Sequence, residues 1–388
     1  MSINKLVFAG IMSVGLLASC AGDETAVDDT AKAAVVNLNV STTTRTSGTS
    51  LPTGTGLVGE AEGTLNRICV CFYNSTTQKV VTLAEYTSSL TSLSVTTTTA
   101  ADSMYVIANA PSGAFAGQTT ASGIRTVIQN LKYTTYASSA TTETTVNSQN
   151  TNYLPMVDRK ATGLSSGTTT SSLSVSLKRL VARAALTGIT VDFSSNTALS
   201  SAGTFQPTEI FMYNANDQLT LEGACTSSSA NSFCVASGLV SGETTGTTTS
   251  TYSTATTTNY SYLSSGYLSS TASTAGSSTS YLSSSPYYFY VYPNTKTASP
   301  TKLVIKGLFY DGSTTTVVYY PIIINHAQTG TTGTSGTETV DANTCYNIAA
   351  TIQGRGSTGP DVDVTPATVT ATISVSAWTT NTEGVTFN

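Results

Sequence analysis

The sequence has little charge, one histidine and one tryptophan. Of its 388 residues only 10% are charged, the formal net charge is -5, and the basic residues are scattered along the chain. Such a chain has no electrostatic surface for nucleic acid, so we expect no nucleic-acid partner. The single histidine, His326, follows an apolar run at the end of an expected strand, where a lone histidine is usually structural or faces solvent.

Motifs of the common enzyme classes are missing as well. The sequence has no nucleophile elbow, no HExxH helix and no glycine-rich loop that would hold a phosphate. Asp361 and Asp363 could bind a cation or act as paired acids, but no third ligand stands at a recognisable spacing. We favour the alternative of solvated carboxylates, and we predict a protein that is not an enzyme and needs no cofactor.

The cysteine spacings do not fit a metal site. Cys20 belongs to a motif described below, and none of the other five cysteines has the CxxC or Cys/His spacing that zinc requires. Cys69 and Cys71 are two residues apart on an expected strand, so they share a face and are poorly placed to bond to each other. Cys225 and Cys234 could close a short surface loop in an oxidising compartment. We expect structural or free thiols at the other positions, Cys69, Cys71 and Cys345.

Long helical periods are nearly absent, and Thr, Ser, Gly, Tyr and Val dominate the composition. These residues favour strands and turns, and 388 residues are enough for two domains with sizeable cores. We therefore predict an all-β secreted protein. One helical stripe predicts a single short helix laid over a sheet, with apolar residues at Ile124, Val127, Ile128 and Leu131.

The N-terminus is typical of an exported protein. Lys5 precedes an apolar run, 6–17, which is too short to span a bilayer but fits the core of a signal peptide. The run ends in Leu-Ala-Ser-Cys at 17–20, which resembles the bacterial lipoprotein motif, in which the chain is cut before the cysteine and the thiol carries lipid. An ordinary signal peptide with a chance cysteine is the alternative. Acidic residues then resemble the surface-export signal of Bacteroidetes lipoproteins; they are Asp23, Glu24, Asp28 and Asp29.

The stretch 33–45 predicts a strand that precedes a protease site. Val36, Leu38 and Val40 alternate with polar residues, as a half-buried strand requires. Arg45 is the first arginine of the chain and lies among small polar residues, where a trypsin-like protease would cut before Thr46. Release of this strand would leave a gap in a sheet that another strand must fill.

A second alternating strand is expected at the C-terminus, 368–378. Its apolar and polar residues alternate as clearly as anywhere in the chain, and a tail with two further apolar residues follows. A removable strand at one end and a matching strand at the other are what polymerisation by strand exchange needs. The expected donor residues are Val369, Ala371, Ile373, Val375, Ala377, Val385 and Phe387.

Other segments leave alternatives open. The tyrosines of the Ser/Thr-rich segment 225–285 could stack on carbohydrate or a partner, but a variable exposed loop is the interpretation that we favour. Lys178, Arg179 and Arg183 could form an anion site, whereas a solvated or inter-domain face is the alternative that we favour. Asp311-Gly312 predicts a hairpin turn between strands at 303–310 and 315–324.

Taken in order, these motifs resemble the fimbrillin family, the major subunits of Bacteroidetes type V pili. The resemblance is carried by the motif at 17–20, the strand before Arg45, and four later segments. They are YLPM at 153–156, KRLVARAAL at 178–186, NTCYNIAATIQGRG at 343–356 and the strand 369–378. The resemblance spans nearly the whole chain outside the Ser/Thr/Tyr-rich insertion.

The resemblance implies an all-β fold of two tandem β-sandwich domains, transthyretin-like or Greek-key, with one or two short helices. It implies a lipoprotein signal peptide at 1–19, a lipidated tether and removable strand at 20–45, an N-terminal sandwich at 46–190, a C-terminal sandwich at 191–367 with the insertion 225–285, and a donor strand at 368–388.

The resemblance also implies the partners and the location. The precursor would be a lipoprotein of the outer membrane, anchored through palmitate or similar chains on Cys20. An arginine-specific protease would cut after Arg45, and the product would polymerise into surface fimbriae with accessory anchor and tip pilins. A stalk subunit is the interpretation that we favour; an adhesive tip, or a surface lipoprotein that binds carbohydrate, is the alternative. A host or bacterial surface ligand remains unidentified.

Overall fold

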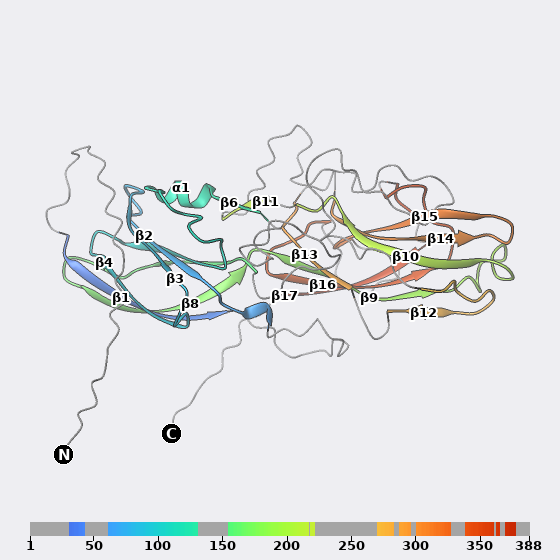
Figure 1. Cartoon of the computed structure of the whole chain (residues 1–388), viewed down its shortest axis with the longest axis horizontal. Coiled ribbons are helices and arrows are strands. Elements are labelled where there is room, and N and C mark those ends of the chain that lie inside the picture. Colours follow the sequence, from blue (N-terminus) through green and yellow to red (C-terminus); the bar gives the residue numbers. More distant parts are fainter. Residues whose placement is uncertain are drawn as a thin grey trace, which may run out of the picture.

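The structure is a computed structural model that describes residues 31–42, 61–130, 154–216, 218–221, 270–282, 287–295, 300–326, 338–360, 362–364 and 369–377. Its strands lie in two groups that follow one another along the long axis of the molecule (Figure 1). Within the described residues, no helix has the length and apolar character needed to cross a membrane.

The first group of strands forms one sheet path with the order β3-β2-β5-β7-β8-β1-β4. The path folds into two layers, because β7 and β8 pair over only two residue pairs. The elements are β1 (Ala33–Thr42), η1 (Ala61–Gly63), β2 (Ile68–Tyr73), β3 (Val80–Tyr86), β4 (Ser92–Thr98), β5 (Ser103–Ala108), α1 (Ala121–Thr126), β6 (Ile128–Asn130), β7 (Met156–Ala161) and β8 (Thr170–Arg179).

The two layers of the first group enclose one hydrophobic core. Alternating residues of β1, β4 and β8 meet alternating residues of β2 and β5 in a single buried cluster. The opposite face of β2 and β5 is also buried, and Ala121 and Ile124 of α1 join the cluster on that side. Because β2 is buried on both faces, all six of its residues are inaccessible to solvent.

The second group of strands forms two sheets that face each other. One has the order β10-β14-β15, and the other has the order β12-β9-β16-β17 with β13 also paired to β9. Both sheets contribute to one buried cluster. The strands are β9 (Ala182–Val191), β10 (Thr204–Tyr213), β11 (Gln218–Thr220), β12 (Thr279–Tyr281), β13 (Tyr287–Val291), β14 (Lys302–Tyr310), β15 (Thr315–Ile323), β16 (Thr344–Ile352) and β17 (Val369–Ala377).

The predicted all-β sandwich architecture is confirmed, and so is the predicted hairpin. β14 and β15 pair antiparallel along their whole length. The carboxylate of Asp311 accepts hydrogen bonds from the backbone N–H groups of Ser313 and Thr314, both at 2.8 Å, and Gly312 has a φ of 100°. A side chain is strained in that conformation, so glycine suits the turn.

The predicted helical stripe is wrong beyond its first turn. α1 ends at Thr126, Val127 is already extended, and Ile128 begins β6, which pairs with β11. The β-branched run Thr126-Val127-Ile128 favours an extended chain, and this preference overrides the apolar period of the stripe. Ile124 is buried over the sheet as predicted, and Leu131 lies outside the described residues.

The partners of β9 show where the first group of strands ends. β9 pairs with β12, β13 and β16, all in the second group, so the pairing changes between Arg179 and Ala182. This lies earlier than the boundary at 190 and 191 expected from the sequence. The end of the expected insertion 225–285 is also not a plain surface loop, because β12 extends the sheet beside β9.

Candidate assembly site

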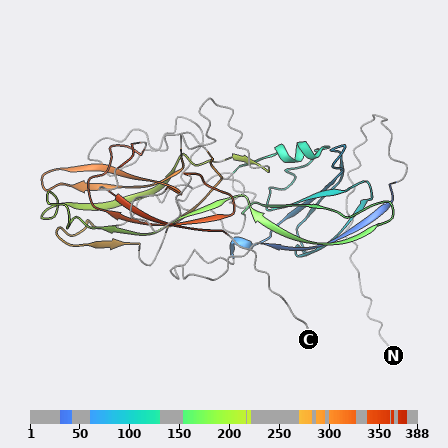
Figure 2. The same ribbon diagram turned by 180° about the vertical axis from the view of Figure 1, so that it is seen from behind.

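β1 lies inside a sheet rather than at its edge. It pairs in parallel with β8 through eight residue pairs and antiparallel with β4 through seven. Figure 2 shows β1 beside the pale green strand β8 on the outer layer of the first group. The condition on which the strand-exchange hypothesis depends is therefore met, since residues 33–42 are not loose in solvent.

The inward side chains of β1 belong to the core. Ala34, Val36, Leu38 and Val40 are each 3% exposed or less. Leu38 stands opposite Leu93 of β4 and Leu173 of β8, so that three leucines form a row across the sheet. Burial of each valine or leucine side chain is worth about 1.5–3 kcal/mol, so this strand contributes strongly to the fold.

The outward side chains of the C-terminal half of β1 are polar, whereas Ala33 and Val35 on the same face are apolar. Asn37 and Asn39 are exposed, and the hydroxyl of Ser41 donates a hydrogen bond to the carbonyl of Val175 at 3.1 Å. This pattern of apolar residues inward and polar residues outward is the one expected of a strand in a half-buried sheet. Any strand that takes the place of β1 must carry the same alternation.

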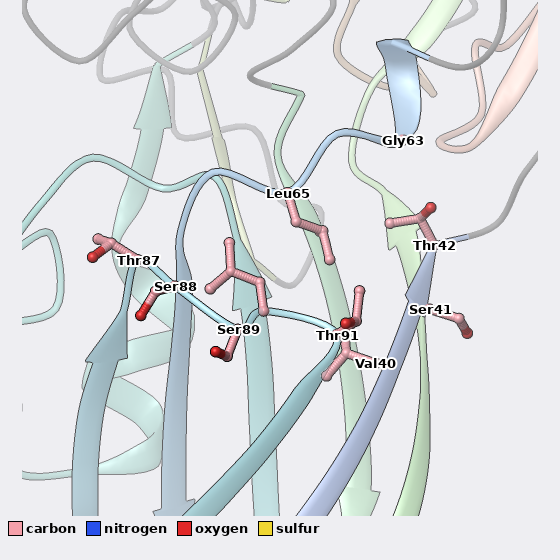
Figure 3. Close-up of a pocket in the computed structure, with 10 residues that line it drawn as sticks. Val40, Ser41, Thr42, Gly63, Leu65, Thr87, Ser88, Ser89 and Thr91 are labelled. Atoms are coloured by element: carbon pink, nitrogen blue, oxygen red, sulfur yellow. The ribbon is translucent and has the colours of Figure 1, made fainter. Parts of the chain in front are cut away.

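A cavity of about 790 Å³ opens at the C-terminal end of β1 (Figure 3). Its walls are the last three residues of β1, Gly63 and Leu65 on the way into β2, and the connection 87–91 between β3 and β4. Leu65 and Leu90 pack against the core of the first group, so the apolar part of the cavity is continuous with that core.

β17 is an end strand of its sheet. Among the described residues its one strand neighbour is β16, with which it pairs antiparallel over nine residue pairs. Two of its side chains are described: Ala371 is 1% exposed and Ile373 is 7% exposed. Ile373 lies opposite Ile348, so these two of the expected donor residues, Ala371 and Ile373, pack in the core of their own subunit.

Charged residues meet in the interior where the two groups of strands join. Nη1 of Arg183 and the hydroxyl of Tyr290 both donate to Oε1 of Glu62 at 2.7 Å. Nε of Arg179 donates to the backbone carbonyl of Glu62 at 3.0 Å. All four residues are 1% exposed or less, and the short blue turn at the junction in Figures 1 and 2 is η1, which carries Glu62.

Burial and charge shift the pKa values of this network. Burial lowers the pKa of Arg179. For Arg183 burial acts in the same direction, but the adjacent Glu62 carboxylate offsets it and the pKa is raised. Burial, together with the negative charge of Glu62, raises the pKa of Tyr290 well above its ordinary value. The network holds two guanidinium groups, one carboxylate and one phenol away from water.

The basic trio and the other polar candidates have structural partners. Of the favoured interpretation, a solvated or inter-domain face, Arg179 and Arg183 fit the inter-domain part, since both are buried at the junction, and Lys178 fits the solvated part, since it is exposed. Nδ1 of His326 lies 2.7 Å from Oε1 of Glu338. The side chain of Asp363 is exposed, as expected, but its carboxylate also forms an ion pair with Nζ of Lys302 at 2.6 Å. No cluster of metal-ligating side chains occurs within the described residues.

The thiols that the structure describes are buried and are not joined in a disulfide. They are Cys69, Cys71 and Cys345. Burial raises the pKa of Cys69 strongly and that of Cys71 to about 12, so both remain protonated at neutral pH. The remaining predicted site residues lie outside the described residues: Cys20, Arg45, Thr46, Cys225, Cys234, Val385 and Phe387.

Glu62 is the residue that sequence reasoning missed. It stands in a run rich in glycine and threonine, and its partners are more than a hundred positions away. Its neighbours in the sequence, Ala61 and Gly63, form no pattern that marks it as buried.

The fold is shared with several solved structures. A candidate cell adhesion protein from Parabacteroides distasonis matches with a TM-score of 0.58 and 15% identity, over 90% of this chain and 98% of that chain. A fimbrilin from Porphyromonas gingivalis W83 matches with a TM-score of 0.55 and 16% identity, over 89% and 98%. The chain has the fimbrillin fold. A candidate cell adhesion protein from Bacteroides eggerthii also matches, with a TM-score of 0.54 and 17% identity, over 89% of this chain and 96% of that chain.

The resemblance inferred from the sequence is thus confirmed at the level of the fold. No protein-family model matches the chain, and no curated protein sequence matches it. At identities of 15–17% the similarity is one of architecture. What the fimbrillin fold does in this chain has to be argued from its own residues.

Proposed function

We propose that the protein is a stalk subunit of surface fimbriae that polymerises by strand exchange. The observation that carries the proposal is the position of β1, an N-terminal strand in the interior of a sheet that is followed three residues later by Arg45. In this proposal a protease cuts after Arg45, β1 leaves, and β17 of a second copy takes its place between β8 and β4.

Export would precede assembly. The precursor would reach the outer membrane as a lipoprotein, with lipid on Cys20 and an acidic tether before β1. Acyl chains hold a protein at a membrane, and cleavage after Arg45 would remove both the tether and the lipid. Anchor and tip pilins and an arginine-specific protease are the accessory partners of the proposal.

The geometry around the cleavage segment suits removal of β1. A β-carbon on Gly63 would lie 2.8 Å from the hydroxyl oxygen of Thr42, so the segment between them begins and ends at one place. Arg45 lies between these two ends in the sequence, and the end at Gly63 is held through Glu62 by Arg183 and Tyr290. A cut at Arg45 therefore separates β1 from the rest of the chain, and Glu62 keeps the new N-terminal part of the chain attached to the fold.

Cleavage alone does not expel β1. The strand keeps two ladders of hydrogen bonds and its buried apolar row, each bond being worth about 0.5–1.5 kcal/mol. It therefore stays bound until another strand with the same alternation displaces it. A growing fibre would supply that strand, which makes polymerisation an exchange rather than the filling of an empty groove.

β17 has the properties of a donor. It has one strand neighbour, so its departure breaks one ladder, whereas insertion between β8 and β4 forms two. Its alternation of apolar and polar residues matches that of β1. Donor and acceptor lie in different groups of strands, so the contact is head to tail, and repetition without ring closure gives a filament.

The test is limited trypsin treatment of the purified precursor. We expect one early cut after Arg45, seen by mass spectrometry, and fibres seen by electron microscopy. The matched control is Arg45→Gln, which removes the arginine that trypsin recognises and leaves β1 unchanged. This variant should remain monomeric. A cleaved product that stays monomeric would contradict the stalk function and favour an adhesive tip or a carbohydrate-binding lipoprotein.

A further inference from the structure

We propose that the cavity at the end of β1 receives the surface of the protease that cuts after Arg45. The inference rests on the proposed function, and it gives a partner to a part of the fold that strand exchange does not itself need. The cavity lies where the chain leaves β1, because Val40, Ser41 and Thr42 form one of its walls (Figure 3). Its occupant is an uncharged surface loop of an arginine-specific protease.

The bond to be cut cannot lie far from this cavity. Arg45 follows Thr42 by three residues, and three residues span about 10 Å at most. Thr42 itself is fixed, since it pairs with Leu177 of β8 and its hydroxyl lies close against Gly63. A protease that binds Arg45 must therefore come close to the fold at Thr42.

A protease is too large to reach such a bond over a flat surface. A domain of about 200 residues has a radius of gyration of about 16 Å. The pocket that selects the arginine lies within a cleft of that domain, so the walls of the cleft would meet the fold around Thr42. A hollow at this place removes the collision, and the cavity of about 790 Å³ is such a hollow.

The chemistry of the cavity suits an uncharged loop. Its floor is apolar, since Leu65 and Leu90 are half-buried and pack against the core of the first group. Its rim carries hydroxyls, since Thr87, Ser88 and Thr91 are exposed. The residues that line the cavity include no charged one, so an ionised side chain would lose water there and gain no ion pair. We expect an aliphatic side chain of the loop on the floor and its backbone polar groups at the rim.

The walls of the cavity are held in place before the protease arrives. Gly63 follows Glu62, which Arg183 holds at 2.7 Å. The connection 87–91 is tied to β1, because the backbone N–H of Val40 donates to the carbonyl of Thr91 at 2.9 Å. A preformed hollow spares the two proteins the cost of ordering a loop on binding.

The experiment fills the cavity and measures cleavage of the folded precursor by trypsin. Ser88→Trp places an indole in the cavity from an exposed position, so the core is left unchanged. Ser166→Trp is the matched control, because Ser166 is exposed in a turn that contacts Lys32 at the opposite end of β1. A denaturant titration of both variants checks that they are equally stable.

We expect kcat/KM for the bond after Arg45 to fall in Ser88→Trp and to stay at the parent value in Ser166→Trp. The fall should be about 10- to 100-fold, because misplacement of a substrate by about 1 Å can cost up to about 100-fold. Equal values for the two variants would overturn the protease site. Normal cleavage of Ser88→Trp with loss of fibres would also overturn it and assign the cavity to a contact between copies.

A second variant separates a filled cavity from a damaged fold. Gly-Ser-Gly-Ser inserted between Thr43 and Thr44 allows Arg45 to lie about 13 Å farther from the fold and keeps Thr44 before it. The protease then no longer needs the hollow, so this insertion in Ser88→Trp should restore kcat/KM to the value for the insertion alone. Cleavage that stays slow would overturn the protease site.

Failure of this proposal differs from failure of the proposed function. A parent chain that trypsin does not cut after Arg45 would overturn both. A parent chain that is cut and stays monomeric would overturn the stalk function, while a fall of kcat/KM in Ser88→Trp would still support the protease site.

Discussion

Leu38 offers the sharpest test of β1 as an outgoing strand. Its side chain is 2% exposed and lies between Leu93 and Leu173 in the leucine row. Replacement by alanine leaves a cavity that surrounding side chains fill only in part, which costs about 2–5 kcal/mol. The precursor carrying Leu38→Ala should therefore unfold at lower denaturant concentration.

The same substitution should speed assembly once Arg45 has been cut. The outgoing strand binds more weakly by the same free energy, and 2 kcal/mol corresponds to about 30-fold in its affinity for the slot. The donor strand is unchanged, so displacement of β1 becomes easier. Fibre growth after cleavage, followed by light scattering, should be faster than for the parent chain by a factor approaching this value.

Leu93→Ala is the matched control for Leu38→Ala. Leu93 is 4% exposed and faces the same core, but it lies on β4, which stays in the subunit. Its loss should destabilise the precursor similarly and weaken the binding of the donor as well as that of β1. An equal increase in growth rate for both variants, or none for Leu38→Ala despite a less stable precursor, would refute the displacement mechanism.

Three further predictions concern the interior. Glu62→Gln leaves the Arg183 cation buried without its anion and should cost about 3–5 kcal/mol in a denaturant titration, whereas Glu338→Gln at the half-exposed His326 pair should cost under about 1 kcal/mol. Burial raises the pKa of Tyr290, so at pH values above the ordinary tyrosine pKa near 10 unfolding releases a proton. The free energy of unfolding should therefore fall as pH rises past that value. In Tyr290→Phe the dependence of this free energy on pH should be shallower by up to about 1.4 kcal/mol per pH unit. Burial also raises the pKa of Cys71 to about 12, so its thiol should react with a maleimide in denaturant but not in the native protein; labelling of native Cys71 would contradict the buried position.

Features that depend on neighbouring residues were predictable from the sequence. The alternation of Val36, Leu38 and Val40 predicts a strand with one buried face, and β1 has that face in the core. Asp311-Gly312 predicts a turn because the carboxylate caps it locally, and the hairpin has this register. Such patterns need no knowledge of distant partners.

Features that depend on distant residues were not predictable. The sequence left open whether Arg179 and Arg183 lie on a solvated or an inter-domain face, and only the tertiary fold places Glu62 beside them. β9 is buried on most of both faces, so it shows no alternation that would assign it to one domain. Only the first turn of the expected helix lies in α1, since the β-branched residues after Arg125 favour an extended chain.

The fimbrillin fold itself does not show how copies of this chain join. The position of β1 between β8 and β4 shows what a partner would have to replace, and the end position of β17 shows what one could offer. These two strands, rather than any catalytic group, are where the function of the described chain would reside.

The central claim is that the place of β1 passes to a strand from another copy, and a structure of the fibre by cryo-electron microscopy tests it most directly. The account predicts that the density between β4 and β8 fits residues 369–377 of a neighbouring subunit and that residues 33–42 are absent. Fibres in which β1 still lies between β4 and β8 would contradict it.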